Sequence, residues 1–234
     1  MKPNQTIARM AGFLYLAFIV IFACSSFIRS GFTVSGNIAA TTHTIVASAQ
    51  LFRIGLISEL VSAALFFLAA WALYVLLEPV DQRLALLFLL LNLGGVAIEC
   101  LNTLNLFGVL LLLGGADYLK AFQAEQVQAA AMFLLDVYRN GFIIAQLFFG
   151  TWLLPLGYLV FKSGFLPRIL GILLIADFFG VLIWFLQFFL LPGYAVITYP
   201  GLAISFIAEV SLSLWLLIKG VNVERLKERV PASA

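Results

Sequence analysis

Charged residues are scarce in this chain of 234 residues. Asp, Glu, Lys and Arg make up 10% of it and hydrophobic residues 64%, whereas an ordinary soluble domain is about 25% charged. The mean hydropathy is +1.12. Few residues remain for a soluble domain, and a net charge of only +2 is too small to suggest nucleic-acid binding. The composition therefore indicates a polytopic membrane protein.

Histidine and cysteine are also rare. The single histidine, His43, excludes bis-histidine haem ligation and any multi-histidine metal site within one chain. Cys24 and Cys100 lie in apolar runs, which predicts small buried side chains and no disulfide framework. The sequence shows no phosphate-binding loop, dinucleotide fingerprint, zinc-protease motif or serine-hydrolase motif. We therefore predict no cofactor and no metal site.

Several apolar stretches are long enough to cross a bilayer, which takes about 20 residues. Because unpaired backbone amides are prohibitive in lipid, each stretch should be helical. The fold class expected is all-α, a membrane bundle of six transmembrane helices. One domain should cover residues 1–222, followed by a short charged tail over 223–234. The expected spans are Ile7–Ile28, Leu51–Leu77, Leu84–Leu113, Phe133–Phe161, Ile169–Leu191 and Gly201–Ile218.

Basic residues distinguish the two sides of this bundle. With both termini on one side, the opposite loops carry only Arg29 and Lys120. The positive-inside rule then predicts cytoplasmic termini in the inner (plasma) membrane of a bacterium. The basic residues on the terminal side are Lys2, Arg9, Arg83, Lys162, Arg168, Lys219, Arg225, Lys227 and Arg229.

Acidic residues inside the spans are the strongest indication of function. Each would cost about 2.5–3.5 kcal/mol if unpaired at the centre of a span, so it must be paired, protonated, hydrated or bound. Polar intramembrane faces point to the bundle interior or to a water-filled cavity. We therefore predict that the polar stripes of these helices converge on one acidic cavity that opens outward. The acids are Glu59, Glu99, Asp136, Asp177 and Glu209.

Basic partners for these acids are too few. Arg139 follows Asp136 by three residues and should pair with it locally. Arg53 precedes Glu59 by six residues, on a different helix face, so we expect it to pair with an acid of another helix. At least one of the remaining acids should then be protonated or bind a cation or amine. The candidate ligand- or ion-binding residues are Glu59, Glu99, Asn102, Asp136, Arg139, Asp177, Glu209 and Arg53.

Local signals mark three further features. Gly164 and Pro167 predict a tight turn between spans four and five, with Gly164 in an unusual backbone conformation. Pro155 predicts a kink in span four. Asp117 is a plausible N-cap for an amphipathic helix that leads into the same span.

Several segments resemble the bacterial membrane family known as domain of unknown function 4386. The resemblance rests on A-R-M-A-G-F-L-Y-L at residues 8–16, L-F-R-I-G at 51–55, the run that begins F-F-G-T-W-L-L-P at Phe148, and the segment from Glu209 to Gly220. It covers nearly the whole chain and implies a multi-helix integral membrane protein, but no activity. The resemblance implies that Arg9, Arg53, Pro167, Arg168 and Glu209 belong to the family pattern.

Three function classes stay open from the sequence. The first is a protein of the lipid bilayer that binds or transports a small solute, a cation or a proton, which the surplus of acids favours. The second is a membrane-embedded enzyme for a lipid-like substrate, with His43 near Glu59 or Asp136 as a base; the absence of a nucleophile motif disfavours it. The third is a scaffold or sensor whose polar core only fixes helix packing.

Overall fold

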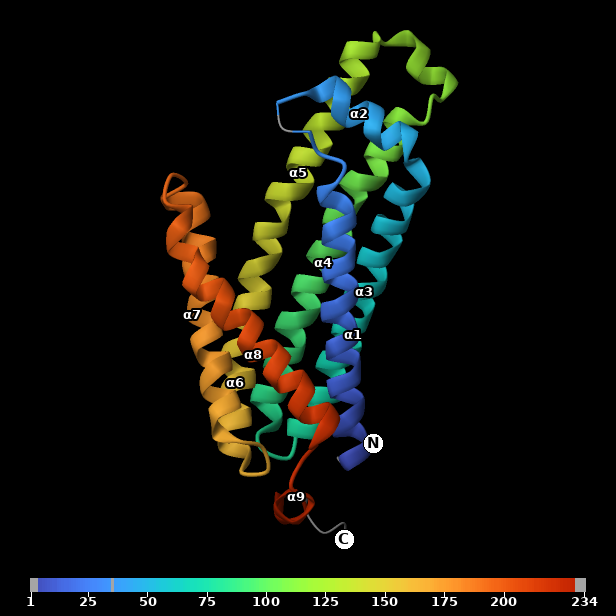
Figure 1. Cartoon of the computed structure of the whole chain (residues 1–234). Coiled ribbons are helices and arrows are strands. Elements are labelled where there is room, and N and C mark those ends of the chain that lie inside the picture. The colour runs from blue at the N-terminus through green and yellow to red at the C-terminus, as the bar shows by residue number, and fades with distance from the viewer. Residues whose placement is uncertain (1–3, 35, 230–234) are drawn as a thin grey trace. The chain divides into compact units, whose positions relative to one another are not determined.

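The computed structural model describes residues 4–34 and 36–229, and this part of the chain is helical without any β-strand (Figure 1). Six of its helical stretches are long and apolar enough to cross a membrane, as the sequence predicts. The elements are α1 (Gln5–Ser30), α2 (Ile38–Ala47), α3 (Ala49–Leu77), α4 (Gln82–Leu113), the short 3₁₀ helix η1 (Asp117–Ala121), α5 (Ala124–Thr151), α6 (Leu153–Ser163), α7 (Arg168–Leu190), the 3₁₀ helix η2 (Ala195–Thr198), α8 (Tyr199–Ile218) and α9 (Val223–Arg229).

The fourth span runs from Ala124 to Ser163 and is longer than predicted. Asp117 does not cap it, because η1 ends before α5 begins. Gln123 provides the cap instead: its carbonyl accepts from the amides of Gln126 and Val127, and its amide donates to the Gln126 side chain at 3.0 Å. This reciprocal arrangement stabilises the first turn, so the predicted lead-in is part of α5 itself.

Pro155 interrupts the same span, as predicted. The ring lacks an N–H and crowds the carbonyl four residues earlier, which is that of Thr151, the last residue of α5. The helix resumes at Leu153 as α6. At the other end of α6, Gly164 has φ 77°, and Pro167 immediately precedes α7, which confirms the predicted turn.

The described residues form two compact units. The chain crosses from one unit to the other within α1, α3, α4 and α5, so each of these helices contributes to both units. The first unit holds residues 4–17, 64–96 and 143–229. The second holds residues 18–34, 36–63 and 97–142.

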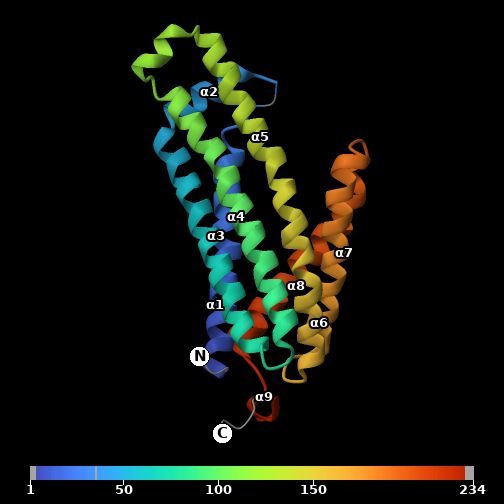
Figure 2. The same ribbon diagram turned by 180° about the vertical axis from the view of Figure 1, so that it is seen from behind.

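Glycines bring the helices of the first unit into backbone contact. Helix α7 lies beside both α6 and α8 (Figure 1 and Figure 2). A Cβ on Gly157 of α6 would lie 2.9 Å from the carbonyl oxygen of Gly171 on α7. A Cβ on Gly180 of α7 would lie 2.8 Å from the Cα of Gly201 on α8. Small residues at such contacts let helices approach closely in lipid, where the hydrophobic effect does not drive their association.

The C-terminal helix α9 docks on the turn between α6 and α7 in the first unit. Arg225 donates to the carbonyl of Gly164 at 3.1 Å, and the amide of Asn222 donates to that of Phe165 at 3.1 Å. Leu226 of α9 is buried. Residues Val223–Arg229 of the predicted charged tail thus form a helix that packs on this turn. The remaining residues of the tail, 230–234, lie outside the described part.

Replacing Leu226 with alanine should release α9. Truncation of a buried leucine costs about 2–5 kcal/mol, far more than an isolated helix of this length can supply. Tryptic cleavage after Arg225 should then become at least about tenfold faster, because cleavage follows the population of the opened helix. Limited proteolysis in detergent measures this rate. Val223→Ala, at an exposed position of the same helix, is the matched control; equal rates for both variants would contradict the docking.

The second unit has its own apolar core. It joins α2 to α3, α4 and α5. Asn37 caps the start of α2, and its side chain accepts from the Ala40 amide at 2.8 Å. The core fixes the rotation of α5 in this unit, with Tyr138 on its buried face. Its members are Phe32, Ile45, Phe52, Leu106, Val109, Ala131, Leu135 and Tyr138.

Apolar side chains also cover the outside of the helices, as expected for surfaces that contact lipid. Phe27, Leu101 and Phe206 are each more than 60% exposed. Cys24 is exposed and Cys100 is half-buried, so the prediction that both cysteines are buried is wrong. An exposed apolar side chain on a span faces hydrocarbon, where a thiol is tolerated as a small hydrophobe.

Candidate functional site

A buried ion pair lies in the second unit. Glu59, near the middle of α3, is 1% exposed. Its Oε2 lies 2.5 Å from Nη1 of Arg29, in the last turn of α1, as an ion pair without an aligned hydrogen bond. Its Oε1 accepts a hydrogen bond from the Tyr138 hydroxyl of α5. Three helices therefore hold one carboxylate.

The guanidinium of Arg29 is positioned by several further contacts. It donates to the Ser25 hydroxyl one turn earlier and to Ser26 at 3.1 Å. Ser25 in turn donates to the carbonyl of Gly55 at 2.8 Å, which ties α1 to α3. The guanidinium carbon also lies 5.5 Å from the centre of the Tyr138 ring. These contacts restrict the rotamer of Arg29 and direct its charge to Glu59.

A second acid, Glu99 of α4, lies beside this pair. It is 4% exposed, and neither carboxylate oxygen has a hydrogen-bond partner among the described residues. The groups that act on it electrostatically are Glu59, Arg29 and the Asn102 side chain. Buried polar atoms are nearly always hydrogen-bonded, and the exceptions are explained by stored strain, a chemical role, or a bound water or ion.

Asn102, one turn after Glu99, mainly joins α4 to α5. Its amide group donates to the carbonyl of Tyr138 at 2.9 Å. Its Oδ1 fills the space beside Gly141, where a Cβ would lie 2.4 Å from it. The Asn102 contact therefore sets the distance between α4 and α5, and with it the placement of Tyr138. We call Arg29, Glu59, Glu99, Asn102 and Tyr138 the Glu59–Glu99 cluster.

The cluster has an excess of acid over base. Arg29 supplies one positive charge, while Glu59 and Glu99 supply two negative charges if both are ionised. An uncompensated charge inside a membrane bundle is strongly unfavourable. The arrangement is therefore suited to take up one further positive charge.

The first unit contains a separate pair of acids. Asp177 of α7 is fully buried, and its Oδ1 is within hydrogen-bond distance of the Ser205 hydroxyl on α8. Glu209, one turn after Ser205, interacts with Asp177 and with Tyr15 of α1. None of the described basic residues forms an ion pair with either acid.

Ser205 indicates how this second pair is satisfied. Its hydroxyl has one hydrogen but lies near two acceptors, Asp177 Oδ1 and the carbonyl of Gly201 at 3.1 Å. The hydroxyl donates to Asp177 Oδ1, so Asp177 on α7 is tied to α8 through Ser205.

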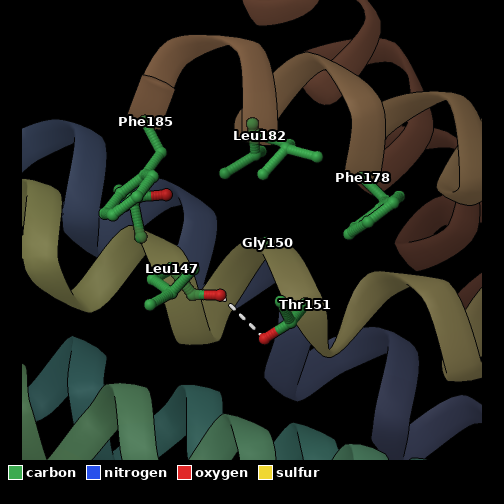
Figure 3. A pocket seen from close by; sticks show the side chains of 8 residues that line it. Leu147, Gly150, Thr151, Phe178, Leu182 and Phe185 are labelled. Atoms are coloured by element: carbon green, nitrogen blue, oxygen red, sulfur yellow. Dashed lines mark hydrogen bonds between the residues drawn. The ribbon is translucent and has the colours of Figure 1, made fainter. Parts of the chain in front are cut away.

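A small pocket lies in the first unit beside the break between α5 and α6 (Figure 3). Its volume for a water-sized molecule is about 10 Å³, which is room for about one water molecule and no larger ligand. The Thr151 hydroxyl at its edge is already bonded to the carbonyl of Leu147 at 2.7 Å. The pocket is thus largely apolar; its lining is Gln146, Leu147, Gly150, Thr151, Phe178, Val181, Leu182 and Phe185.

Comparison with known proteins identifies the family. Residues 10–220 match the family described as "Domain of unknown function (DUF4386)". The chain belongs to this family. An "Uncharacterized protein" of Archaeoglobus fulgidus is 32% identical over 184 residues, which cover 79% of this chain and 88% of that protein. No solved structure matches. The resemblance noted from the sequence is confirmed, and the family description names no activity for this DUF4386 protein.

The polar stripe predicted for the fourth span of this DUF4386 chain lies on the outer surface and not on the inner face. The sequence placed Asp136 and Arg139 on the inner face of the fourth span, but their side chains are 47% and 51% exposed. They form the predicted local pair, and this mutual neutralisation lets them lie on the outer surface. The buried face of α5 carries Leu135 and Tyr138 instead.

The prediction that Arg53 pairs with an acid of another helix is also wrong. Arg53 is exposed on α3 and makes no ion pair within residues 4–34 and 36–229. Arg29, assigned to a loop by the sequence, is helical and provides the cation for Glu59, with its own side chain 16% exposed. It directly follows the predicted end of span one, and an arginine there is long enough to reach an acid on the next helix. That position was the signal that could have identified it.

The structure thus sorts the predicted residues of this DUF4386 protein into groups. It brings Glu59, Glu99 and Asn102 together in the second unit, and Asp177 with Glu209 in the first. Asp136, Arg139 and Arg53 join neither group. The sequence analysis missed Arg29 and Tyr138 in the first group. Because Asp136 lies on the outer surface, the prediction of a cavity common to all five acids is wrong, and one shared by the other four stays a prediction.

Proposed function

We propose that this DUF4386 protein binds a proton or a small cation at acidic residues buried in its transmembrane helices, and moves that ion, alone or with a small solute, across the membrane. The observation that carries the proposal is the excess of acid over base in the Glu59–Glu99 cluster, where Glu99 is buried and neither of its oxygens has a hydrogen-bond partner in the described part of the chain. The acid pair Asp177 and Glu209, without a basic ion-pair partner among the described residues, supports it. Intramembrane acids of this kind mark ion pathways and proton relays.

The orientation belongs to the proposal as well. The excess of Lys and Arg on the terminal side favours cytoplasmic termini in an inner (plasma) membrane. In that orientation Arg29 lies at the outer end of α1, so the Glu59–Glu99 cluster would take up its ion from the outside.

A flux measurement tests the proposal. The purified protein is reconstituted in liposomes that enclose a pH-sensitive dye, and a potassium diffusion potential drives ion entry. We expect the wild type to carry protons or a monovalent cation above the rate of protein-free liposomes. Glu99→Gln should lower that rate at least about tenfold, as expected when a group that carries the ion is removed. Asp117→Asn, in the exposed η1, is the matched control and should have wild-type flux.

The same assay can refute the proposal. If a Glu99→Gln/Asp177→Asn/Glu209→Gln variant had the flux of the wild type, ion binding by these acids would not underlie any transport. A wild-type rate equal to that of empty liposomes, for protons and for every monovalent cation tried, would have the same consequence.

A structural role is the second candidate function. It is favoured by Glu59, whose two oxygens have Arg29 and Tyr138 as partners and which thereby links α1, α3 and α5. In a scaffold or sensor, amide substitutions would alter the melting temperature and leave binding and flux unchanged. The enzyme alternative gains no such support, because His43 is exposed on α2 and forms no ion pair in the described part of the chain.

A further inference from the structure

We infer that the ligand of the Glu59–Glu99 cluster is a proton carried by Glu99, and that Arg29 and Tyr138 hold Glu59 as its permanently ionised counterpart. This assignment rests on the proposed function and deepens it, because it separates the roles of the two acids and names the ion.

The contacts of Glu59 are those of a carboxylate. One oxygen accepts from the Tyr138 hydroxyl and the other faces the Arg29 guanidinium at 2.5 Å. An ionised carboxyl group only accepts hydrogen bonds, and these two groups donate. If Glu59 were the protonated acid, Arg29 would be left facing a neutral group in a buried position.

The surroundings of Glu99 are those of a neutral acid. A carboxylate needs several donors, but neither oxygen of Glu99 has one at hydrogen-bond geometry among the described residues, and the Asn102 side chain is the one neutral donor near it. A protonated Glu99 has a single O–H to donate, and the Glu59 carboxylate beside it is an acceptor within interaction range. With Arg29 positive, Glu59 negative and Glu99 neutral, the cluster has no net charge.

A metal ion or an amine fits this position less well. Hard cations take about six or more oxygen ligands, whereas the oxygens at hand are mainly those of the two carboxyl groups. The described residues contain no group of three or more His, Cys, Asp or Glu side chains that could hold a metal. A second cation would also lie beside the Arg29 guanidinium and be repelled by it. A proton needs neither extra ligands nor space.

Release of the proton has a defined consequence. The O–H bond of Glu99 breaks, the electron pair stays on the carboxylate, and the proton passes to water. Two carboxylates then face one guanidinium, so Arg29 must be shared between Glu59 and Glu99. The titratable and charged groups that face this event are Arg29 from α1, Glu59 from α3, Tyr138 from α5, and Cys100 next to Glu99 on α4.

Infrared difference spectroscopy tests the assignment on the full-length protein in lipid nanodiscs. We expect the wild type to show the C=O stretching band of a neutral carboxyl group, which disappears on alkaline titration. Glu99→Gln should lose this component. Tyr138→Phe, which removes a partner of Glu59 but no carboxyl group, should keep it. Replacing sodium or potassium with choline at constant pH should leave the band unchanged.

Two results would overturn the inference: a carboxyl band of unchanged amplitude in Glu99→Gln, or a band whose titration depends on the sodium or potassium concentration. If Glu99→Gln fails to fold, Glu99→Met, apolar and of similar volume, replaces it in the same comparison. The inference and the proposed function fail separately. Loss of the band with wild-type flux would refute transport through this site and retain the proton assignment; loss of flux with an intact band would do the reverse.

Discussion

Glu59→Gln should destabilise the protein by about 3–5 kcal/mol, the usual cost of removing one partner of a buried ion pair. The variant leaves Arg29 without its counterion and Tyr138 without the carboxylate to which it donates. The measurement is reversible unfolding in mixed micelles with increasing SDS, followed by circular dichroism. The loss should be visible as an earlier transition with a similar slope.

Two further variants sharpen this prediction. Arg29→Gln combined with Glu59→Gln should recover much of the loss, because both charges are then absent. Glu59→Gln combined with Glu99→Gln should lose at least as much stability as Glu59→Gln alone, because Glu99 can then no longer supply a carboxylate to pair with Arg29. Glu99→Gln alone is the matched control and should change stability by less than about 1 kcal/mol, because the amide has nearly the volume of the acid and can donate to the Glu59 carboxylate in its place. A loss of similar size in Glu59→Gln and Glu99→Gln would contradict the assigned roles.

Gly12→Ala should destabilise the first unit by about 3 kcal/mol, the upper end of the usual range for overpacking. The new Cβ would lie 2.4 Å from the backbone nitrogen of Leu217 and 2.6 Å from the carbonyl oxygen of Ser213. Both atoms belong to the backbone of α8 and cannot move aside as a side chain can, so α1 and α8 must separate. A glycine-to-alanine change within a helix ordinarily stabilises a protein, because alanine favours the helix by about 1 kcal/mol. At Gly12 we expect the opposite, a loss of stability.

A helical glycine with a softer neighbour is the control for Gly12. At Gly55 the nearest atom to a new Cβ is a side-chain methyl of Ile28, at 3.2 Å. Gly55→Ala should therefore be close to neutral in the same unfolding measurement. If Gly12→Ala were as stable as the wild type, the close packing of α1 against α8 would be wrong. Because Tyr15 lies one turn after Gly12 and interacts with Glu209, the substitution should also disturb the acid pair of the first unit.

The sequence alone determined the class of this protein and its spans. Hydropathy is a local property that acts on each stretch separately, so composition and run length predict a six-span bundle, and the structure confirms this. Gly164 and Pro167 also act locally, and their turn is where the sequence places it. The positions of the intramembrane acids follow in the same way, because an acid within a span is unfavourable wherever its partners lie.

Only the tertiary structure decided which groups meet. Lipid and protein interior are both apolar, so the two sides of a span look alike in sequence, and helical periodicity cannot tell an inward polar stripe from an outward one. The prediction for α5 therefore chose Asp136 and Arg139, which neutralise each other on the surface, over Tyr138, which reaches Glu59. The choice of Arg29 over Arg53 depends on the rotation and register of α1 against α3, set by contacts such as that of Ser25 with Gly55 between residues far apart in the chain.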